Sequence, residues 1–185
     1  MRGDRSWGKL ILEVFSIVLG VLLALAVGEW QQARENKERA SIALQNVQLE
    51  LKANQEILTR IHENNRRTIE IAQNSDDDDN ENVQFIPGVQ VRSTAWDTLL
   101  ASGISVHIDY EVLLALSETY SMQSIYRETG MKLFEASMSM AAMATVDEKQ
   151  IDNESMQGHF MSHFTMLLSM EEVMLKSYRE SLELF

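Results

Sequence analysis

The chain has 185 residues, with 16 Lys or Arg, 28 Asp or Glu, and a formal net charge of −12 at pH 7. It contains no cysteine, which excludes disulfides, thiolate metal sites and thiol nucleophiles. The first 40 residues hold 6 basic and 5 acidic groups, so residues 41–185 carry a net charge of −13. Such an acidic surface repels nucleic acid and anionic headgroups, so we expect no nucleic-acid partner and a domain that stands off the membrane.

An apolar segment dominates the start of the chain. Residues 10–28 read LILEVFSIVLGVLLALAVG, in which Glu13 and Ser16 are the polar exceptions. As a helix this segment would be roughly 28 Å long, close to the thickness of a bilayer's hydrocarbon layer. Trp7 and Trp30 flank it, as interfacial anchors do. The pattern predicts one transmembrane helix over residues 7–30, in contact with the lipid bilayer.

A cleavable signal peptide is the alternative for this segment. Ala24, Leu25 and Ala26 have the small-x-small pattern of a cleavage site. The length of the apolar run and the acidic Glu13 within it favour a membrane anchor that remains on the protein.

Small residues recur every four positions in the segment, at Ser16, Gly20, Ala24 and Gly28. This spacing places them in one lengthwise stripe, where the backbone of another helix can approach closely. Chance spacing on a lipid-facing helix is the alternative. Glu13 lies near the same stripe. Because an unpaired charge in hydrocarbon is unfavourable, its carboxyl group is either protonated, paired with a donor on a neighbouring helix, or bent back toward the headgroups. We take these five residues as a candidate transmembrane packing face.

The flanking charges suggest an orientation. Three basic residues lie on each side of the segment. Those before it, Arg2, Arg5 and Lys9, are close together, whereas those after it, Arg34, Lys37 and Arg39, are interleaved with glutamates. Lys and Arg favour the cytoplasmic side. We therefore expect a short cytoplasmic N-terminus at residues 1–6, a bacterial inner-membrane location, and residues 31–185 in the periplasm.

The remainder of the chain predicts an all-α fold. One proline and eight glycines occur in the chain, and strand-like alternation is scarce. The transmembrane helix is expected to continue to about Gln73, because apolar residues recur at alternating gaps of four and three, as in a coiled-coil seam. The seam comprises Ala40, Leu44, Val47, Leu51, Asn54, Leu58, Ile61, Asn65, Thr68 and Ala72. Asn54 and Asn65 either fix the register or oligomer number, or lie at the edge of a wider antiparallel packing.

Later segments predict an antiparallel helical bundle. Residues 74–88 form an acidic loop, whose four aspartates (76–79) are read as a solvated tip rather than a calcium site, because the spacing of an EF-hand is absent. Thr94 and Asp97 resemble a capping box that opens a short helix ending at Gly103. Asp109 can cap a further helix to about residue 145, and a final helix runs from Glu154 to near the end, with Phe160, Phe164, Leu167, Met170, Met174 and Tyr178 at helical spacing.

Three patches of the sequence carry a resemblance. They are Glu13 followed by IVLGVLLALAVGEW, the stretch AWDTLLASGI around Trp96, and the stretch YEVLLALSETY around Tyr120. Together they resemble an uncharacterised family of short bacterial single-pass membrane proteins, a domain of unknown function. The resemblance implies a membrane-anchored helical protein and supplies no activity.

A methionine-rich region offers a metal-site hypothesis. Met156, His159 and His163 are spaced to share one face of a helix, and thioethers with imidazoles suit copper(I), while imidazole pairs also suit zinc. Methionine is also an ordinary filler of helix packing, and paired histidines often lie on a helix surface, so we expect no bound cofactor. Nucleophile elbows, phosphate loops and Glu-x-x-His pairs are absent from the sequence, and we expect no enzyme.

Two functions are consistent with these features of the sequence. The first is an interaction or accessory subunit whose span packs on a partner membrane protein or on itself. The second is an extracytoplasmic module whose helices bind a small ligand or metal.

Overall fold

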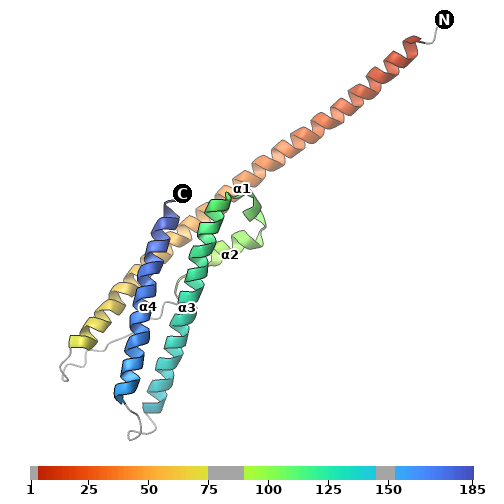
Figure 1. The fold of residues 1–185 in the computed structure, drawn as a ribbon. Helices are drawn as coiled ribbons and strands as arrows, with labels where there is room; N and C mark the ends of the chain where they lie inside the picture. Colours follow the sequence, from red (N-terminus) through yellow and green to blue (C-terminus); the bar gives the residue numbers. More distant parts are fainter. Residues whose placement is uncertain (1–3, 75–89, 145–152) are drawn as a thin grey trace.

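The computed structural model describes residues 4–74, 90–144 and 153–185 (Figure 1). Within these ranges the chain forms four α-helices and one short 3-10 helix: α1 (Asp4–Asn74), α2 (Thr94–Ala101), η1 (Ile104–His107), α3 (Tyr110–Ala144) and α4 (Asn153–Leu182). The predicted all-α class is confirmed. The acidic loop, including its four aspartates, lies outside the described residues.

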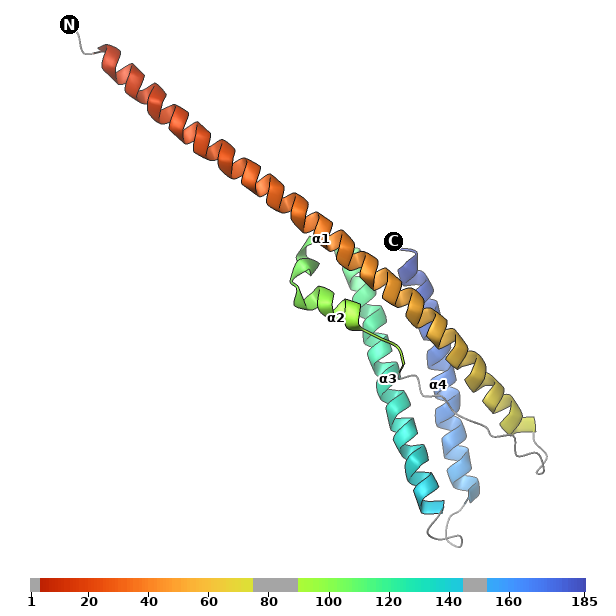
Figure 2. The same ribbon diagram turned by 180° about the vertical axis from the view of Figure 1, so that it is seen from behind.

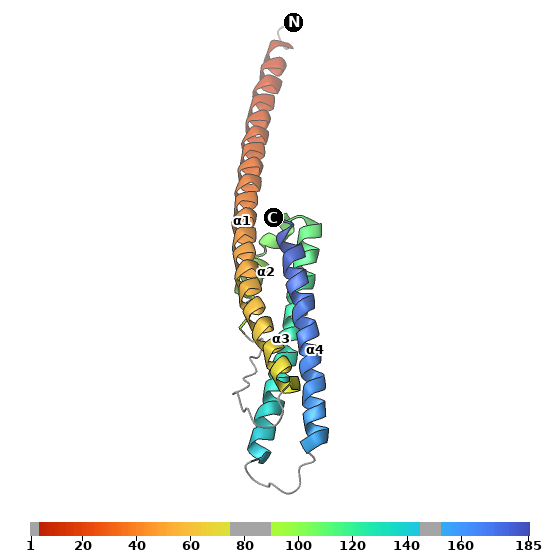
Figure 3. The same ribbon diagram turned by 90° about the vertical axis from the view of Figure 1, so that its left-hand side faces the viewer.

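Helix α1 is a single rod of 71 residues, roughly 105 Å long. Residues 31–74 contain no glycine or proline, so nothing in this stretch breaks the hydrogen-bonded ladder that begins in the apolar segment. The first part of α1 stands clear of all other elements, whereas its second part forms one wall of the bundle (Figure 3). The predicted continuation of the apolar helix into the domain is confirmed.

The three long helices do not all alternate in direction. Helix α4 is antiparallel to both α1 and α3, which themselves run the same way (Figure 1). Arg92 bonds to Asn54, about 30 Å back along α1 from its end at Asn74. The chain therefore returns toward the middle of α1 before α3 begins. Figure 2 shows α2 beside α1, while α4 packs on both α1 and α3.

The core follows the predicted seam of α1 until its last turns. Val47, Leu51 and Leu58 are fully buried, Ala40 and Ile61 are nearly so, and Leu44 is half-buried. Beyond Asn65 the buried position is Ile69 instead of the predicted Thr68, which is half-buried. The gap of four from Asn65 to Ile69 reflects the 3.6-residue period of a straight helix, which drifts away from a strict 3.5-residue repeat.

The ends of the short helices are set by particular residues. The N-cap residue of α2 is Ser93, not the predicted Thr94, and the Ser93 hydroxyl donates to the Asp97 carboxylate at 2.9 Å. Gly103 follows with φ of 69°, a left-handed conformation that glycine adopts without a steric penalty, and this ends the helix as predicted. At α3, the side chain of Asp109 accepts from the Glu111 amide at 2.9 Å, so its predicted capping role is confirmed.

Candidate interaction site

The apolar part of α1 is fully exposed. It is the one helix in the described part of the chain that is long and apolar enough to cross a membrane, and no part of that stretch is buried in the structure. A core helix of a water-soluble protein passes the same length test but is covered by its own chain. Here Leu12 is 72 % exposed and Trp30 66 %, so this segment has an environment other than the bundle.

The predicted packing face lies open along this segment. Glu13, Ser16, Gly20, Ala24 and Gly28 are all exposed. A methyl group built on Gly20 or Gly28 would meet no atom within 4 Å, so the described chain itself does not require glycine at either position. The structure brings the five residues onto one side of α1, and no described element contacts them.

The packing face and the buried seam lie on opposite sides of α1. Each residue turns an α-helix by about 100°, which places Gly20 and Ala24 roughly opposite the line of Val47, Leu51 and Leu58. The bundle therefore covers one side of the rod, and the small residues face the other side. A helix that approached the packing face would meet no obstruction from the bundle.

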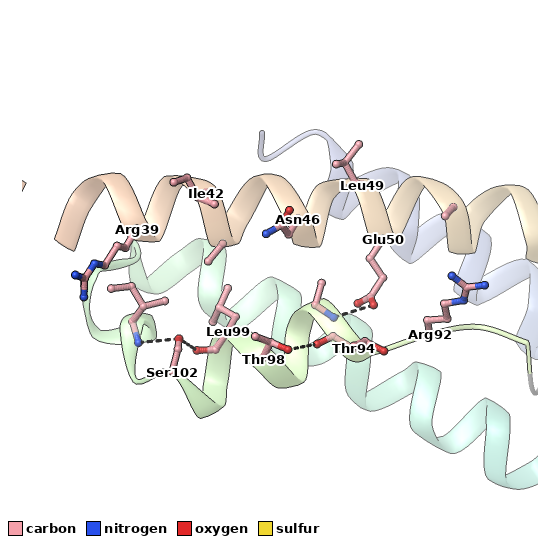
Figure 4. A pocket seen from close by; sticks show the side chains of 14 residues that line it. Arg39, Ile42, Asn46, Leu49, Glu50, Arg92, Thr94, Thr98, Leu99 and Ser102 are labelled. Atoms are coloured by element: carbon pink, nitrogen blue, oxygen red, sulfur yellow. Dashed lines mark hydrogen bonds between the residues drawn. The ribbon is translucent and has the colours of Figure 1, made fainter. Parts of the chain in front are cut away.

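An open groove lies between α1 and α2 (Figure 4). Its volume is about 820 Å³, within the range of small-molecule sites. Apolar side chains of Leu49, Leu99 and Ile104 line it together with the charged Arg39 and Arg92. The groove combines apolar surface with Arg39 at one end, Arg92 at the other and the Glu50 carboxylate between them, so it could hold a small, partly apolar molecule.

Glu50 fixes one wall of this groove. Its carboxylate accepts from the Ala95 amide at 2.9 Å, from the Trp96 amide at 3.4 Å and from the Tyr120 hydroxyl at 2.8 Å. These amides belong to the first turn of α2, whose own N-cap side chain makes no capping bond. A residue of α1 thus caps α2, and Trp96 stacks on Tyr120 with ring centroids 5.1 Å apart. Burial, followed by the Glu50 contact, raises the pKa of Tyr120.

A buried polar layer joins α1, α3 and the segment before α2. Asn54 donates to the Arg92 carbonyl at 2.6 Å and to Gln123 at 3.1 Å, and its own oxygen accepts from the Arg92 amide at 2.8 Å. The Tyr178 hydroxyl donates to Gln123 at 2.6 Å. Asn54 is fully buried, so the interpretation that places it at the edge of the packing is wrong.

A second layer surrounds Glu171 of α4, a residue that the sequence reading missed. This carboxylate is fully buried and contacts His62 at 3.1 Å, Asn65 at 2.8 Å and the Tyr126 hydroxyl at 3.1 Å. Burial raises the pKa of Glu171, against the opposing effect of the bonds from Asn65, His62 and Tyr126. Asn65 is fully buried as well, so the edge interpretation is also wrong for this residue.

A signal for Glu171 is present in the sequence. Phe164, Leu167, Met174 and Tyr178 are buried, and Glu171 completes their alternation of gaps of three and four. The sequence analysis predicted Met170 at this position of the apolar pattern, and Met170 is half-buried. The polar groups in these two layers are satisfied, since no buried side-chain nitrogen or oxygen in the described residues lacks a hydrogen-bond partner.

The proposed metal ligands are only partly described. His163 lies on the exposed side of α4, and the side chains of Met156 and His159 lie outside the described residues. Within the described residues, no group of three His, Cys, Asp or Glu side chains is placed to hold a metal ion.

These elements define a helical-bundle protein built on one long helix, the apolar N-terminal third of which is exposed. No protein-family model matches the chain, and neither a curated protein nor a solved structure matches it.

Proposed function

We propose that this chain is a membrane-anchored interaction or accessory subunit. Its apolar helix would cross the bacterial cytoplasmic membrane with the N-terminus inside, and would pack on a partner membrane protein or on a second copy. The observation that supports this best is the open packing face: five residues suited to close helix contact, on the side of α1 away from the bundle.

The test compares small-to-large substitutions on two sides of the same helix. Ala24→Leu places a large side chain on the packing face, whereas Ala26→Leu makes the same change roughly 160° around the helix. The full chain, extracted in a mild detergent, is sized by light scattering, and co-eluting proteins are identified by mass spectrometry. We expect Ala24→Leu, and likewise Gly20→Leu, to reduce assembly, and Ala26→Leu to leave it intact.

Glu13 provides a second arm of the test. If its carboxylate pairs with a donor on the partner helix, Glu13→Gln should weaken assembly while leaving membrane insertion unchanged. A wild-type particle that contains a single protomer and no other protein would refute the proposal. Equal assembly of the Ala24→Leu and Ala26→Leu variants would refute the packing face.

The groove between α1 and α2 supports a second candidate, a ligand-binding module. A bound ligand stabilises the folded state, so it should raise the unfolding temperature of the full chain. Ala53, which lines the groove and is exposed, offers a blocking variant: Ala53→Trp should abolish the stabilisation. The metal form of this candidate predicts that zinc or copper(I) stabilises wild type and not a His159→Ala, His163→Ala double variant.

A further inference from the structure

The 3-10 helix η1 lies level with the end of the apolar segment. Val106, Ile108 and Asp109 line one hollow with Glu29 and Gln32 of α1. Glu29 precedes Trp30, the residue expected at the outer membrane interface, and Gln32 follows it by two positions. Figure 2 shows η1 at the end of the bundle from which the apolar part of α1 emerges. The end of the bundle therefore reaches the level at which the span would leave the hydrocarbon.

This end carries unusual apolar exposure. Outside residues 7–30, the two most exposed large hydrophobic side chains in the described structure are Val106, at 79 %, and Tyr110, at 73 %. Ile104 and Ile108, on either side of Val106, pack against the core and hold the segment in place. Two side chains suited to an apolar environment thus point away from a firmly attached segment, and tyrosine is enriched at membrane interfaces.

This end of the bundle carries a small excess of negative charge. The hollow beside η1 is lined by two carboxylates, Glu29 and Asp109, and by one Lys, Lys37, and Glu111 lies in the first turn of α3. Contact with lipid at this end would depend on apolar burial and not on attraction to anionic headgroups.

We propose that the end of the bundle formed by η1 and the start of α3 rests on the headgroup layer of the bilayer that α1 crosses, with Val106 and Tyr110 in contact with lipid. The headgroup layer is about 5–8 Å thick on each side, so a segment level with Glu29 and Gln32 lies within it. This inference rests on the membrane anchoring of the proposed function, and goes beyond it by assigning a lipid contact to the bundle.

The absence of cysteine makes a depth measurement direct. Single-cysteine variants of the full chain, each with an environment-sensitive fluorophore, are reconstituted into phosphatidylcholine vesicles with or without phosphatidylglycerol. Val106→Cys and Tyr110→Cys report on the proposed contact, and Leu19→Cys reports on the span. Glu63→Cys, an exposed position about 50 Å beyond Trp30 along α1, is the matched control. Nitroxide-labelled lipids and aqueous iodide are the two quenchers.

We expect headgroup-labelled lipids to quench positions 106 and 110 far more strongly than position 63, equally with and without the anionic lipid. If positions 106 and 110 behave like position 63 while position 19 is quenched by lipid, the bundle contact is refuted and the anchoring stands. If position 19 is not quenched either, the anchoring itself fails. Protection of positions 106 and 110 from both quenchers would indicate a protein cover and would overturn the lipid contact.

Discussion

Replacing Glu50 of α1 by alanine should destabilise the bundle, because Glu50 caps another helix, α2. The substitution removes the acceptor of the Ala95 and Trp96 amides in the first turn of α2, and of the Tyr120 hydroxyl. Loss of a helix cap is worth about 0.5–2 kcal/mol, and a hydrogen bond to a charged group about 1.5–3 kcal/mol. Because Glu50 is half-buried and water can reach part of the site, we expect a loss of about 2–4 kcal/mol in the free energy of unfolding.

The structure supplies its own reporter for this measurement. Trp96 stacks on Tyr120 beside Glu50, whereas Trp7 and Trp30 are exposed in the apolar segment. In a Trp7→Phe, Trp30→Phe background, the fluorescence of Trp96 follows unfolding of the detergent-solubilised full chain in urea. Glu56→Ala, at an exposed position of the same helix, is the matched control and should change stability by less than about 0.5 kcal/mol.

A double-mutant cycle separates the cap from the tyrosine contact. Tyr120→Phe removes the hydroxyl and retains the ring that stacks on Trp96. Since Glu50 and Tyr120 share a hydrogen bond, the effects of Glu50→Ala and Tyr120→Phe should add to more than that of the double variant. A Glu50→Ala variant as stable as Glu56→Ala would refute the assignment of Glu50 as the cap of α2.

Three further predictions concern the bundle. Burial raises the pKa of Glu171 above its ordinary value of 4.5. The carboxyl's contribution to stability is therefore complete below that pH and is lost as pH rises through the folded-state pKa. Urea titrations across this range should show that the stability of Glu171→Gln increases relative to wild type as pH rises, and a constant difference would contradict this. Gly103→Ala should lower stability by about 1–2 kcal/mol, since the added methyl meets no atom and the left-handed backbone alone opposes it; an unchanged urea midpoint would exclude that strain. Leu51→Ala, at a fully buried seam position, should lower the free energy of unfolding by about 2–5 kcal/mol, and a value below about 1 kcal/mol would mean that the seam is not packed as described.

The continuity of α1 and most of its buried seam could be predicted because both depend on local sequence. A run without glycine or proline keeps the helix intact, and apolar spacing marks the covered side, as at Val47, Leu51 and Leu58. Gly103 and Asp109 were also predictable, since a left-handed turn and a helix cap each require few residue types.

Contacts between distant segments were not predictable in the same way. Glu50 caps a helix 45 residues further along the chain, and Glu171 accepts a hydrogen bond from Asn65, which is 106 residues away in the sequence. Helical spacing tells which side of a helix is covered but not which partner covers it. The same limit applies to the direction of α3, because periodicity does not record where the chain goes between two helices. For the same reason, the sequence does not identify which helix would pack on the open packing face.

The unbroken course of α1 from the apolar segment into the bundle makes it a lever arm. About 65 Å of helix lies beyond Trp30, so a change of 20° in the tilt of the span would swing its far end by roughly 22 Å. With the apolar segment anchored in a bilayer as proposed, any neighbour that changed the tilt of this helix would move the whole bundle over the membrane surface.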